Sequence, residues 1–338
     1  MNTLLISDLH LTDAPRDSYR WKLFDWLIEV MPQHDVKNLF ILGDITDAKD
    51  YHSARLVNRL VGALLGLYRR GGLHYIHLLR GNHDGTDPHC PYFEFLGQYP
   101  SIRYISTPFT FPLNGQDVLA LPHSRDPQKD WDGVEMHNVD LILMHATVRG
   151  AVAENGQVLE GVPPSLLATA RRAKIYSGDV HVPQKLGRVE YVGAPYPVRF
   201  GDSFVPRAIL LEKGKARDLL PPAIRRGVIT VDATQAGLAG LSAYSKGDQV
   251  KVRVRLNPSE YLDWQKIKKN VTAACTEQGV ELCGLELERT PPRRLLRKSG
   301  APLQQQRTPQ DILKAFCAAN KVDGSSAAVA DGILEKLL

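Results

Sequence analysis

Five short polar motifs, each placed directly after an apolar run, constrain this 338-residue chain more than any other feature. Asp8 and His10 follow the first run, and their spacing of two on extended backbone points both side chains to one face. The other motifs are Gly-Asp-Ile-Thr-Asp at 43–47, Gly-Asn-His-Asp at 81–84, His145, and Gly-Asp-Val-His at 178–181. In open α/β sheets, sites form outside the carboxyl ends of the strands. We therefore expect five strand ends to deliver these side chains to one edge.

The apolar runs alternate with helical stretches, which predicts an α/β fold. Strands are expected at 3–7, 38–42 and 73–79, with helices at 18–30 and 53–70 between them. Further strand candidates are 118–121, 140–144, 174–176, 190–192 and 208–211. Together they predict two packed mixed β-sheets flanked by helices, an α/β/β/α sandwich, followed by a small β-α-β domain and C-terminal helices.

The pattern changes at Pro221 and Pro222, which indicates a domain boundary. The small β-α-β domain is predicted from an initial strand at 227–231, a strand at 249–256, a helix at 259–278 and a strand at 280–287. A stretch rich in Pro, Arg and Gln follows it, and then two short helical patterns. We expect four segments: a catalytic domain at 1–221, the small domain at 222–288, a basic linker at 289–307 and a helical pair at 308–338.

The strand at 249–256 places valine and leucine on one face and three basic residues on the other. The basic residues are Lys251, Arg253 and Arg255. They are candidates for contacts with DNA phosphates, because such contacts come mainly from lysine and arginine. The alternative is the solvated face of an edge strand, where basic residues prevent aggregation. The sequence leaves both interpretations open.

Histidine and charge are distributed unevenly along the chain. All eleven histidines lie between His10 and His181. Residues 1–215 contain 23 basic and 24 acidic side chains and residues 216–338 contain 19 and 13, so the net charge of +5 is −1 plus +6. A basic C-terminal third is a modest indication of a polyanionic partner. The four cysteines form no CxxC pair and no apolar run is long enough for a signal peptide or a membrane span, so we expect a cytoplasmic protein without membrane contact.

The polar motifs supply aspartate, histidine and asparagine without cysteine, a set that suits Mn²⁺, Fe²⁺ or Zn²⁺ better than an all-oxygen Mg²⁺ or Ca²⁺ site. A carboxylate has two oxygens, so Asp44 can bridge a pair of ions. We expect two Mn²⁺ ions, with Mg²⁺, Fe²⁺ or Zn²⁺ as alternatives.

The five motifs, in this order, resemble those of the calcineurin-like metallophosphoesterases. Within that superfamily the chain is most similar to the SbcD-type DNA-repair nucleases, because Val-Gly-Ala-Pro at 192–195 and Phe-Gly-Asp at 200–202 follow the last motif as they do in that branch. The small domain also resembles the DNA-capping domain of those enzymes. The resemblance implies a metal-dependent DNA exonuclease, with possible endonuclease activity, that is the catalytic subunit of an SbcCD-like repair and recombination complex.

Carried over by position, the resemblance implies a role for each motif residue. The ligands of the first ion would be Asp8, His10, Asp44 and His181, and those of the second Asp44, Asn82 and His145. His83 would donate a proton to the leaving oxygen, with Asp84 orienting its ring and Asp47 positioning a ligand. His52 and His123 lie near the same edge and stay outside this set, because each is equally compatible with a surface role and with a phosphate contact.

The chain departs from the family at one ligand position. The last motif normally reads Gly-His-x-His, and here Asp179 replaces the first histidine. A carboxylate can still bind the second ion directly, and this is our prediction. The alternative is a position behind the ligands, where Asp179 would act by hydrogen bonding.

The C-terminal helices carry apolar stripes that two short helices cannot bury alone. One stripe is Ile312, Leu313 and Phe316, and the other is Val329, Ile333 and Leu337. The resemblance implies that they bind an SbcC-type ATPase and that the nuclease is a homodimer; the alternative is that the helices fold back on the catalytic domain. Two other functions stay open: a phosphatase or phosphodiesterase acting on small phosphoesters, and a non-catalytic scaffold of the same fold.

Overall fold

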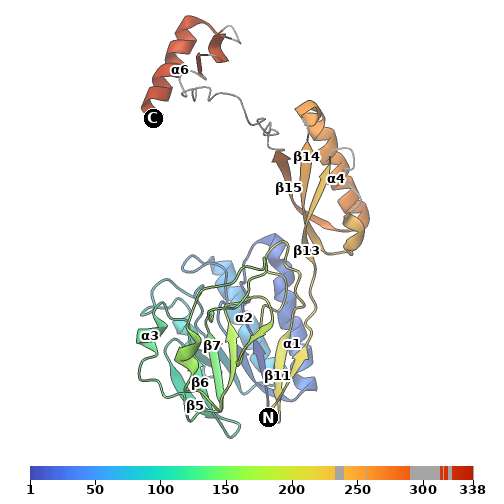
Figure 1. Cartoon of the computed structure of the whole chain (residues 1–338). Helices are drawn as coiled ribbons and strands as arrows, with labels where there is room; N and C mark the ends of the chain where they lie inside the picture. Colours follow the sequence, from blue (N-terminus) through green and yellow to red (C-terminus); the bar gives the residue numbers. More distant parts are fainter. Residues whose placement is uncertain (233–239, 257, 290–312, 315, 319–321, 338) are drawn as a thin grey trace. The chain divides into compact units, whose positions relative to one another are not determined.

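The computed structural model describes residues 1–232, 240–256, 258–289, 313–314, 316–318 and 322–337. The chain forms two compact units, Met1–Arg289 and Thr290–Leu338. In Figure 1 the larger unit runs from blue at β1 to orange-red at β15 and holds all three β-sheets.

The first sheet of the larger unit has the strand order β12-β11-β1-β2-β3-β4. Strands β1 to β4 are parallel, and β11 and β12 continue the sheet antiparallel beside β1. The strands are β1 Asn2–Ile6, β2 Val36–Ile41, β3 Tyr75–Leu79, β4 Ile102–Ile105, β11 Ala208–Glu212 and β12 Lys215–Leu219. Because β1, β2 and β3 are parallel, their carboxyl ends lie at the same edge.

Two helices pack against this sheet, α1 (Lys22–Gln33), which follows the 3₁₀ helix η1 (Pro15–Trp21), and α2 (Ala54–Gly71). The Ser53 hydroxyl caps α2 by accepting a hydrogen bond from the Leu56 N–H. Four leucines three or four positions apart are buried along α2, and each contributes about 1.5–3 kcal/mol to stability. They are Leu56, Leu60, Leu64 and Leu67.

The second sheet has the order β5-β6-β7-β8-β10-β9, with β6, β7, β8 and β10 parallel and antiparallel strands at both edges. The strands are β5 Phe109–Leu113, β6 Gln116–Leu121, β7 Leu141–His145, β8 Lys174–Gly178, β9 Gln184–Leu186 and β10 Val189–Tyr191. The remaining short helices of this region are η2 Glu94–Gln98, α3 Pro127–Asp130 and η3 Pro164–Leu167.

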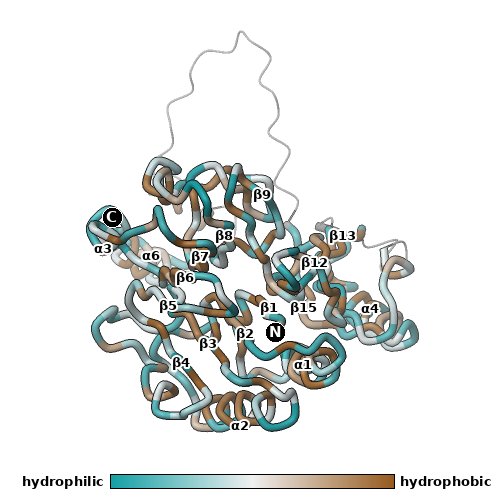
Figure 2. Tube along the Cα trace, turned by 90° about the horizontal axis from the view of Figure 1, so that it is seen from below, coloured by the Kyte–Doolittle hydropathy of each residue, from teal (hydrophilic) through white to brown (hydrophobic). Residues whose placement is uncertain are grey.

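The two sheets pack face to face through one apolar layer. Leu5, Phe40 and Leu79 of the first sheet contribute to it, together with Phe111 and Leu143 of the second. Figure 2 shows the strands of the two sheets as two layers, with α1 and α2 beyond the layer that holds β1, β2 and β3. The predicted arrangement of two packed mixed sheets flanked by helices is confirmed.

The small domain is a three-stranded sheet with one long helix, and the same compact unit contains it. Its strands β13 (Arg226–Asp232), β14 (Gln249–Leu256) and β15 (Glu281–Arg289) are all parallel. The helix α4 (Trp264–Gln278) connects β14 to β15, after the 3₁₀ helix η6 (Pro258–Asp263). The 3₁₀ helix η5 (Leu241–Ala243) precedes β14. The predicted β-α-β pattern is present, and β13 corresponds to the strand expected at 227–231.

In the C-terminal unit, residues 313–314 and 316–318 are helical and α6 spans Gly324–Leu337. The Asp323 carboxylate accepts a hydrogen bond from the Ser326 N–H and caps α6. Almost all of the predicted basic linker, and the predicted helix start at Thr308, lie outside the described residues. None of the described helices combines the length and apolar character that a membrane span requires.

Candidate metal centre

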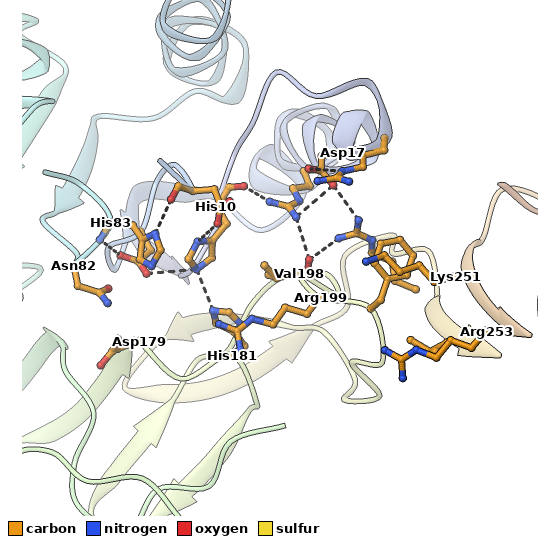
Figure 3. Close-up of a pocket in the computed structure, with 17 residues that line it drawn as sticks. His10, Asp17, Asn82, His83, Asp179, His181, Val198, Arg199, Lys251 and Arg253 are labelled. Carbon is orange, nitrogen blue, oxygen red and sulfur yellow. Dashed lines mark hydrogen bonds and ion pairs between the residues drawn. The ribbon is translucent and has the colours of Figure 1, made fainter. Parts of the chain in front are cut away.

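The five predicted motifs meet where the two sheets end. Asp8 and His10 follow β1, Asp44 follows β2, and Asn82 and His83 follow β3. From the second sheet, His145 ends β7, and Asp179 and His181 follow β8. Among the motif residues, three groups of potential ligand atoms lie within 4.8 Å of one another: Asp8, His10 and His181; His10, Asp44 and His83; and Asp8, Asp44 and His145. Figure 3 shows His10, His83, Asn82, Asp179 and His181 around one pocket.

Asp44 lies at the centre of this cluster. Its Oδ2 is 3.4 Å from His10 Nε2, and its Oδ1 is 3.4 Å from His145 Nε2. The two oxygens therefore face two different histidines, as a bridging carboxylate requires.

Four of the cluster residues have a left-handed backbone, which non-glycine residues rarely adopt. The φ angles are 56° at Asp8, 43° at His10, 53° at Asp44 and 77° at Asp179. Such strain collects at functional sites, where the surrounding structure holds it in place. Each conformation turns the chain sharply at the end of a strand and aims the side chain at the shared edge.

Two glycines allow the second sheet's histidine to approach the first sheet closely. A Cβ at Gly43 would overlap the ring of His145, and a Cβ at Gly178 would overlap Ser7 Oγ and the Leu42 carbonyl oxygen. His145 Nδ1 is 2.6 Å from that same carbonyl oxygen, to which it donates a hydrogen bond. The proton on Nδ1 leaves Nε2 free to bind an ion.

The donor atoms fit divalent cations. One atom of the Asn82 side-chain amide lies 2.8 and 3.0 Å from the two Asp44 oxygens and 3.1 Å from His145 Nε2, and this atom can be the amide oxygen where a cation lies among these groups. An amide turned the other way would donate to Asp44 instead. Asp8 Oδ2 is buried without a hydrogen-bond partner, and His10 Nε2 is 3.0 Å from His181 Nε2. Buried polar atoms normally have partners, so these atoms suit metal coordination.

Burial and nearby charges set the protonation of His10 and His145. For His10 the result is the neutral ring that metal binding requires. Burial lowers the pKa of His10 to about 4, so the ring is neutral near pH 7. Burial would also lower the pKa of His145, but the carboxylates of Asp44, Asp179 and Asp8 raise it to about 9. A proton on His145 therefore balances the clustered carboxylates, and a cation can take over that role.

Asp179 is tied to the cluster by three contacts. Its Oδ2 accepts a hydrogen bond of 2.6 Å from the Thr147 hydroxyl, and its Oδ1 is 3.6 Å from His145 Nε2. Its N–H donates to Asp8 Oδ1 at 3.1 Å. The oxygen that faces His145 is placed for a ligand role, while the other is held by Thr147. Direct metal binding by Asp179 therefore stays a prediction.

The Asp84 carboxylate was expected to orient the His83 ring, but another group holds that ring. His83 Nδ1 donates a hydrogen bond of 2.7 Å to the main-chain oxygen of Asp47. The Asp84 carboxylate is fully buried and accepts hydrogen bonds from the N–H groups of Asp44, Ile45 and Gly81. It therefore fixes the loop that carries Asp44, and the prediction that it orients the His83 ring is wrong. The Asp47 carboxylate lies 3.3 Å from His10 Nδ1, in agreement with a positioning role.

Glu154 is a site residue that the sequence interpretation missed. Its Oε1 is 3.0 Å from His181 Nδ1, on the side of the ring away from Nε2. It lies in the irregular segment between β7 and β8, which no periodicity constrains. Its only signal in the sequence is an acidic residue within the otherwise uncharged stretch 150–159.

A buried ion network joins the small domain to the metal centre. Asp17 is 3.4 Å from Arg20 and 3.1 Å from Arg226 of β13. Arg20 also donates to the main-chain oxygen of His10, and both arginines donate to the Val198 oxygen (Figure 3). Breaking a buried pair of this kind by removing one partner typically costs about 3–5 kcal/mol. The root of β13 is thereby fixed to a candidate ligand loop.

The strand β14 alternates as predicted, with valines buried and basic residues half-buried or exposed. The neighbouring strand β15 is acidic, however. Arg253 is 3.2 Å from Glu286, and Arg255 is 3.1 Å from Glu288. The three basic residues share one face of β14 as predicted, but the β14–β15 register places a glutamate beside each arginine, so the face of the assembled sheet is mixed in charge. Lys251 instead lies 4.9 Å from the ring centroid of Phe200, in cation–π geometry.

A cleft of about 540 Å³ extends from the metal centre to the small domain. His10, Asp44, Asn82 and His181 line it, and Arg199, Phe200, Lys251 and Arg253 line it too. Among the residues that the structure describes, neither Arg199 nor Lys251 forms a salt bridge. The cleft therefore joins the candidate ligands to two cations without carboxylate partners.

The part of the chain that carries the five motifs matches a known protein family. Residues 1–183 match the family described as Calcineurin-like phosphoesterase. No curated protein is significantly similar in sequence. Among solved structures, the chain is similar to an archaeal phosphodiesterase (13% identity, 65% of this chain and 99% of that one, TM-score 0.38). It is also similar to a dimetal phosphatase from Danio rerio (13% identity, 65% and 98%, TM-score 0.40) and to a protein of unknown function from Aquifex aeolicus (18%, 57% and 89%, TM-score 0.30).

Proposed function

Since this chain belongs to the calcineurin-like phosphoesterase family, we propose that it is a DNA nuclease that hydrolyses phosphodiester bonds with two divalent metal ions. Asp8, His10, Asp44 and His181 would hold one ion, and Asp44, Asn82 and His145 the other, with Asp179 beside it. The ligand chemistry favours Mn²⁺. When bound, such ions polarise the phosphate and lower the pKa of water.

His83 is the proposed proton donor to the leaving sugar oxygen. The Asp47 main-chain oxygen fixes its Nδ1–H, which settles the orientation of the ring. In the protonated ring, Nε2 carries the second proton, and this is the one that can be transferred. The residue lines the cleft beside Asp44 and Asn82, where the scissile phosphate would lie.

The observation that carries the preference for DNA is the extension of the cleft to Arg199, Phe200 and Lys251. A small phosphate monoester would need only the ligand cluster. A nucleic acid has further phosphates and bases along its length, which suit unpaired cations and an aromatic ring. The Phe200 ring is half-buried, and both Arg226 and Lys251 lie in cation–π geometry with it, so this part of the cleft combines an aromatic ring with positive charge.

The second candidate is a phosphatase or phosphodiesterase that acts on small phosphoesters. The ligand cluster serves that chemistry equally well, and the pairing of Arg253 and Arg255 with glutamates weakens the basic face. A non-catalytic scaffold is disfavoured, because clustering buried carboxylates without a cation is costly.

The proposal includes a homodimer and an SbcC-type ATPase partner bound by the C-terminal unit, as the resemblance implies. In α6, the Val329 and Ile333 side chains are 64% and 55% exposed and share one face, so the helix offers an apolar surface. Removal of residues 308–338 should abolish co-purification with the ATPase. Retained binding would exclude this part of the proposal.

The proposed activity is tested by incubating linear DNA with the metal-free protein, with and without added Mn²⁺, and measuring the release of nucleotides. Cleavage should appear only with the metal. Asp44→Asn should reduce it by at least a hundredfold and lower the number of bound ions, because it removes one of the two charged contacts of the bridge. Metal-independent cleavage would contradict the proposal.

A further inference from the structure

A second, smaller pocket of about 80 Å³ shares Asn82 with the cleft. It is formed by the loop after β3, the loop after β6 and the end of the Asp44 loop. Its polar lining residues include Lys49, Arg80, Asn82, His123, Arg125 and Asp130. His123 also lies close to the metal centre, with its ring centroid 6.2 Å from that of His145. A group bound in this pocket would therefore be adjacent to a substrate phosphate at the metals.

The pocket is positively charged. Three basic side chains line it against one carboxylate, and among the described residues none of the three forms a salt bridge. Asp130 accepts a hydrogen bond of 2.6 Å from the Ser124 hydroxyl. The guanidinium groups of Arg80 and Arg125 stay charged and repel each other, so an anion beside them would be stabilised.

Donor groups in the pocket lack acceptors. Arg80 is only 7% exposed, and its Nε has no hydrogen-bond partner. Its Nη2 donates to the His123 main-chain oxygen at 2.5 Å, which holds the guanidinium against the pocket wall. His123 Nδ1 is also buried without a partner. A buried guanidinium with an unused N–H is rare in a folded chain, so Arg80 keeps a positive charge at the pocket wall that a ligand with acceptor oxygens would neutralise.

We propose that this pocket binds a second phosphate group of the substrate, next to the phosphate at the metal centre. Its volume admits one phosphate but no nucleobase, so the preferred ligand is a nucleotide that ends in a phosphate monoester. This inference rests on the proposed function, because it names the substrate of the same site. A neighbouring hollow of about 500 Å³ shares His123 and Arg125 with the pocket and leaves room for the nucleoside.

The test compares the binding of thymidine 3′,5′-bisphosphate with that of the two thymidine monophosphates to the full-length, Mn²⁺-loaded protein by calorimetry. The bisphosphate should bind about tenfold more tightly than either monophosphate, because it fills both phosphate positions. Arg125→Gln should bring the ratio of dissociation constants close to one, and Arg125→Lys should give an intermediate ratio. Arg125 is exposed and has one hydrogen bond, to the Thr86 oxygen, so its loss should not unfold the chain.

The matched control is Arg172→Gln, which removes one positive charge from an exposed pair with Asp140 away from the pocket and should keep the wild-type ratio. A wild-type ratio near one, or equal effects of the Arg125 and Arg172 variants, would overturn the proposal. The proposal would also be overturned if Arg125→Gln weakened the binding of all three thymidine phosphates equally. The pocket would then hold the same phosphate as the metals. The binding measurement does not require DNA cleavage, so a failure to cleave DNA would count against the nuclease function alone.

Discussion

The Glu154 carboxylate lies 3.0 Å from Nδ1 of His181, and this hydrogen bond lowers the pKa of Glu154 to about 2. A carboxylate at Nδ1 fixes the proton there and turns Nε2 toward the ion. We expect Glu154→Ala to weaken metal affinity about tenfold to a hundredfold, measured by metal titration. Activity should recover at saturating metal, because Glu154 positions a ligand and does not touch the substrate.

The control for this change is Glu160→Ala, in the same segment between β7 and β8. Glu160 is exposed and paired only with Arg149, at 3.2 Å, and surface pairs contribute about 0–1 kcal/mol. It should bind metal as the wild type does. Equal metal affinity of Glu154→Ala and the wild type would show that Glu154 does not position His181.

The role of His83 predicts a separation of metal binding from catalysis. His83→Gln should lower kcat about a hundredfold or more, because it removes the proton donor while sparing the proposed metal ligands. The number of bound ions and the affinity for DNA should stay close to wild type, by elemental analysis and a filter-binding assay. Loss of one ion would instead identify His83 as a ligand.

His77 predicts a pH dependence of folding that is independent of the metal centre. It is 1% exposed and stacks on Phe40 and Phe111, with centroids 4.1 and 5.5 Å away. Burial, aided by Arg103, lowers its pKa from 6.5 to about 3. Below pH 6.5 the unfolded chain therefore binds a proton that the folded chain does not, and stability falls by about 1.4 kcal/mol per pH unit until the folded pKa is reached.

His77→Phe keeps the aromatic stack and removes this titration. Urea unfolding at about pH 6.5 and about pH 5 should show a loss of stability that is about 2 kcal/mol smaller in the variant than in the wild type. His137→Gln, at an exposed position, should behave as the wild type. An identical loss in His77→Phe and the wild type would exclude a neutral buried His77.

On the small domain, the salt bridges of Arg253 and Arg255 with glutamates change the expected contribution of the basic residues to DNA binding. Lys251→Gln should reduce the salt dependence of DNA affinity by about one phosphate contact, since Lys251 lines the cleft without a salt bridge. Substituting Arg253 and Arg255 together should have less effect per residue than Lys251→Gln, because each must leave a glutamate to contact DNA. If the salt dependence of DNA affinity falls by the same amount per residue for all three substitutions, Glu286 and Glu288 do not compete with DNA.

The sequence predicted the elements that follow local rules. Asp8, Asn82 and His145 could be assigned because polar residues after apolar strands must collect at one edge of a parallel sheet. The alternation of β14 was also predictable, since its period of two is local. The clustering of these potential ligands was therefore predictable from the sequence.

Features that depend on register and on irregular chain could not be predicted. The glutamates opposite Arg253 and Arg255 belong to a strand whose register is set by a helix and a turn. Asp84 lies next to His83 in sequence, but the tight turn there directs it to backbone N–H groups. Glu154 reaches His181 through a loop with no period.

The central claim, hydrolysis of DNA phosphodiesters by this metal centre, is tested most directly by a ratio of specificity constants. On one Mn²⁺-loaded preparation, kcat/KM is measured for a short DNA strand and for an aryl phosphate monoester, with Asp44→Asn as the control for contaminating nuclease. The account predicts a ratio of at least about a hundred in favour of DNA, corresponding to about 2.7 kcal/mol of extra transition-state stabilisation from the cleft, and no activity above background in the variant. A ratio of one or less, with the monoester hydrolysed by the same centre, would contradict it and identify a phosphatase.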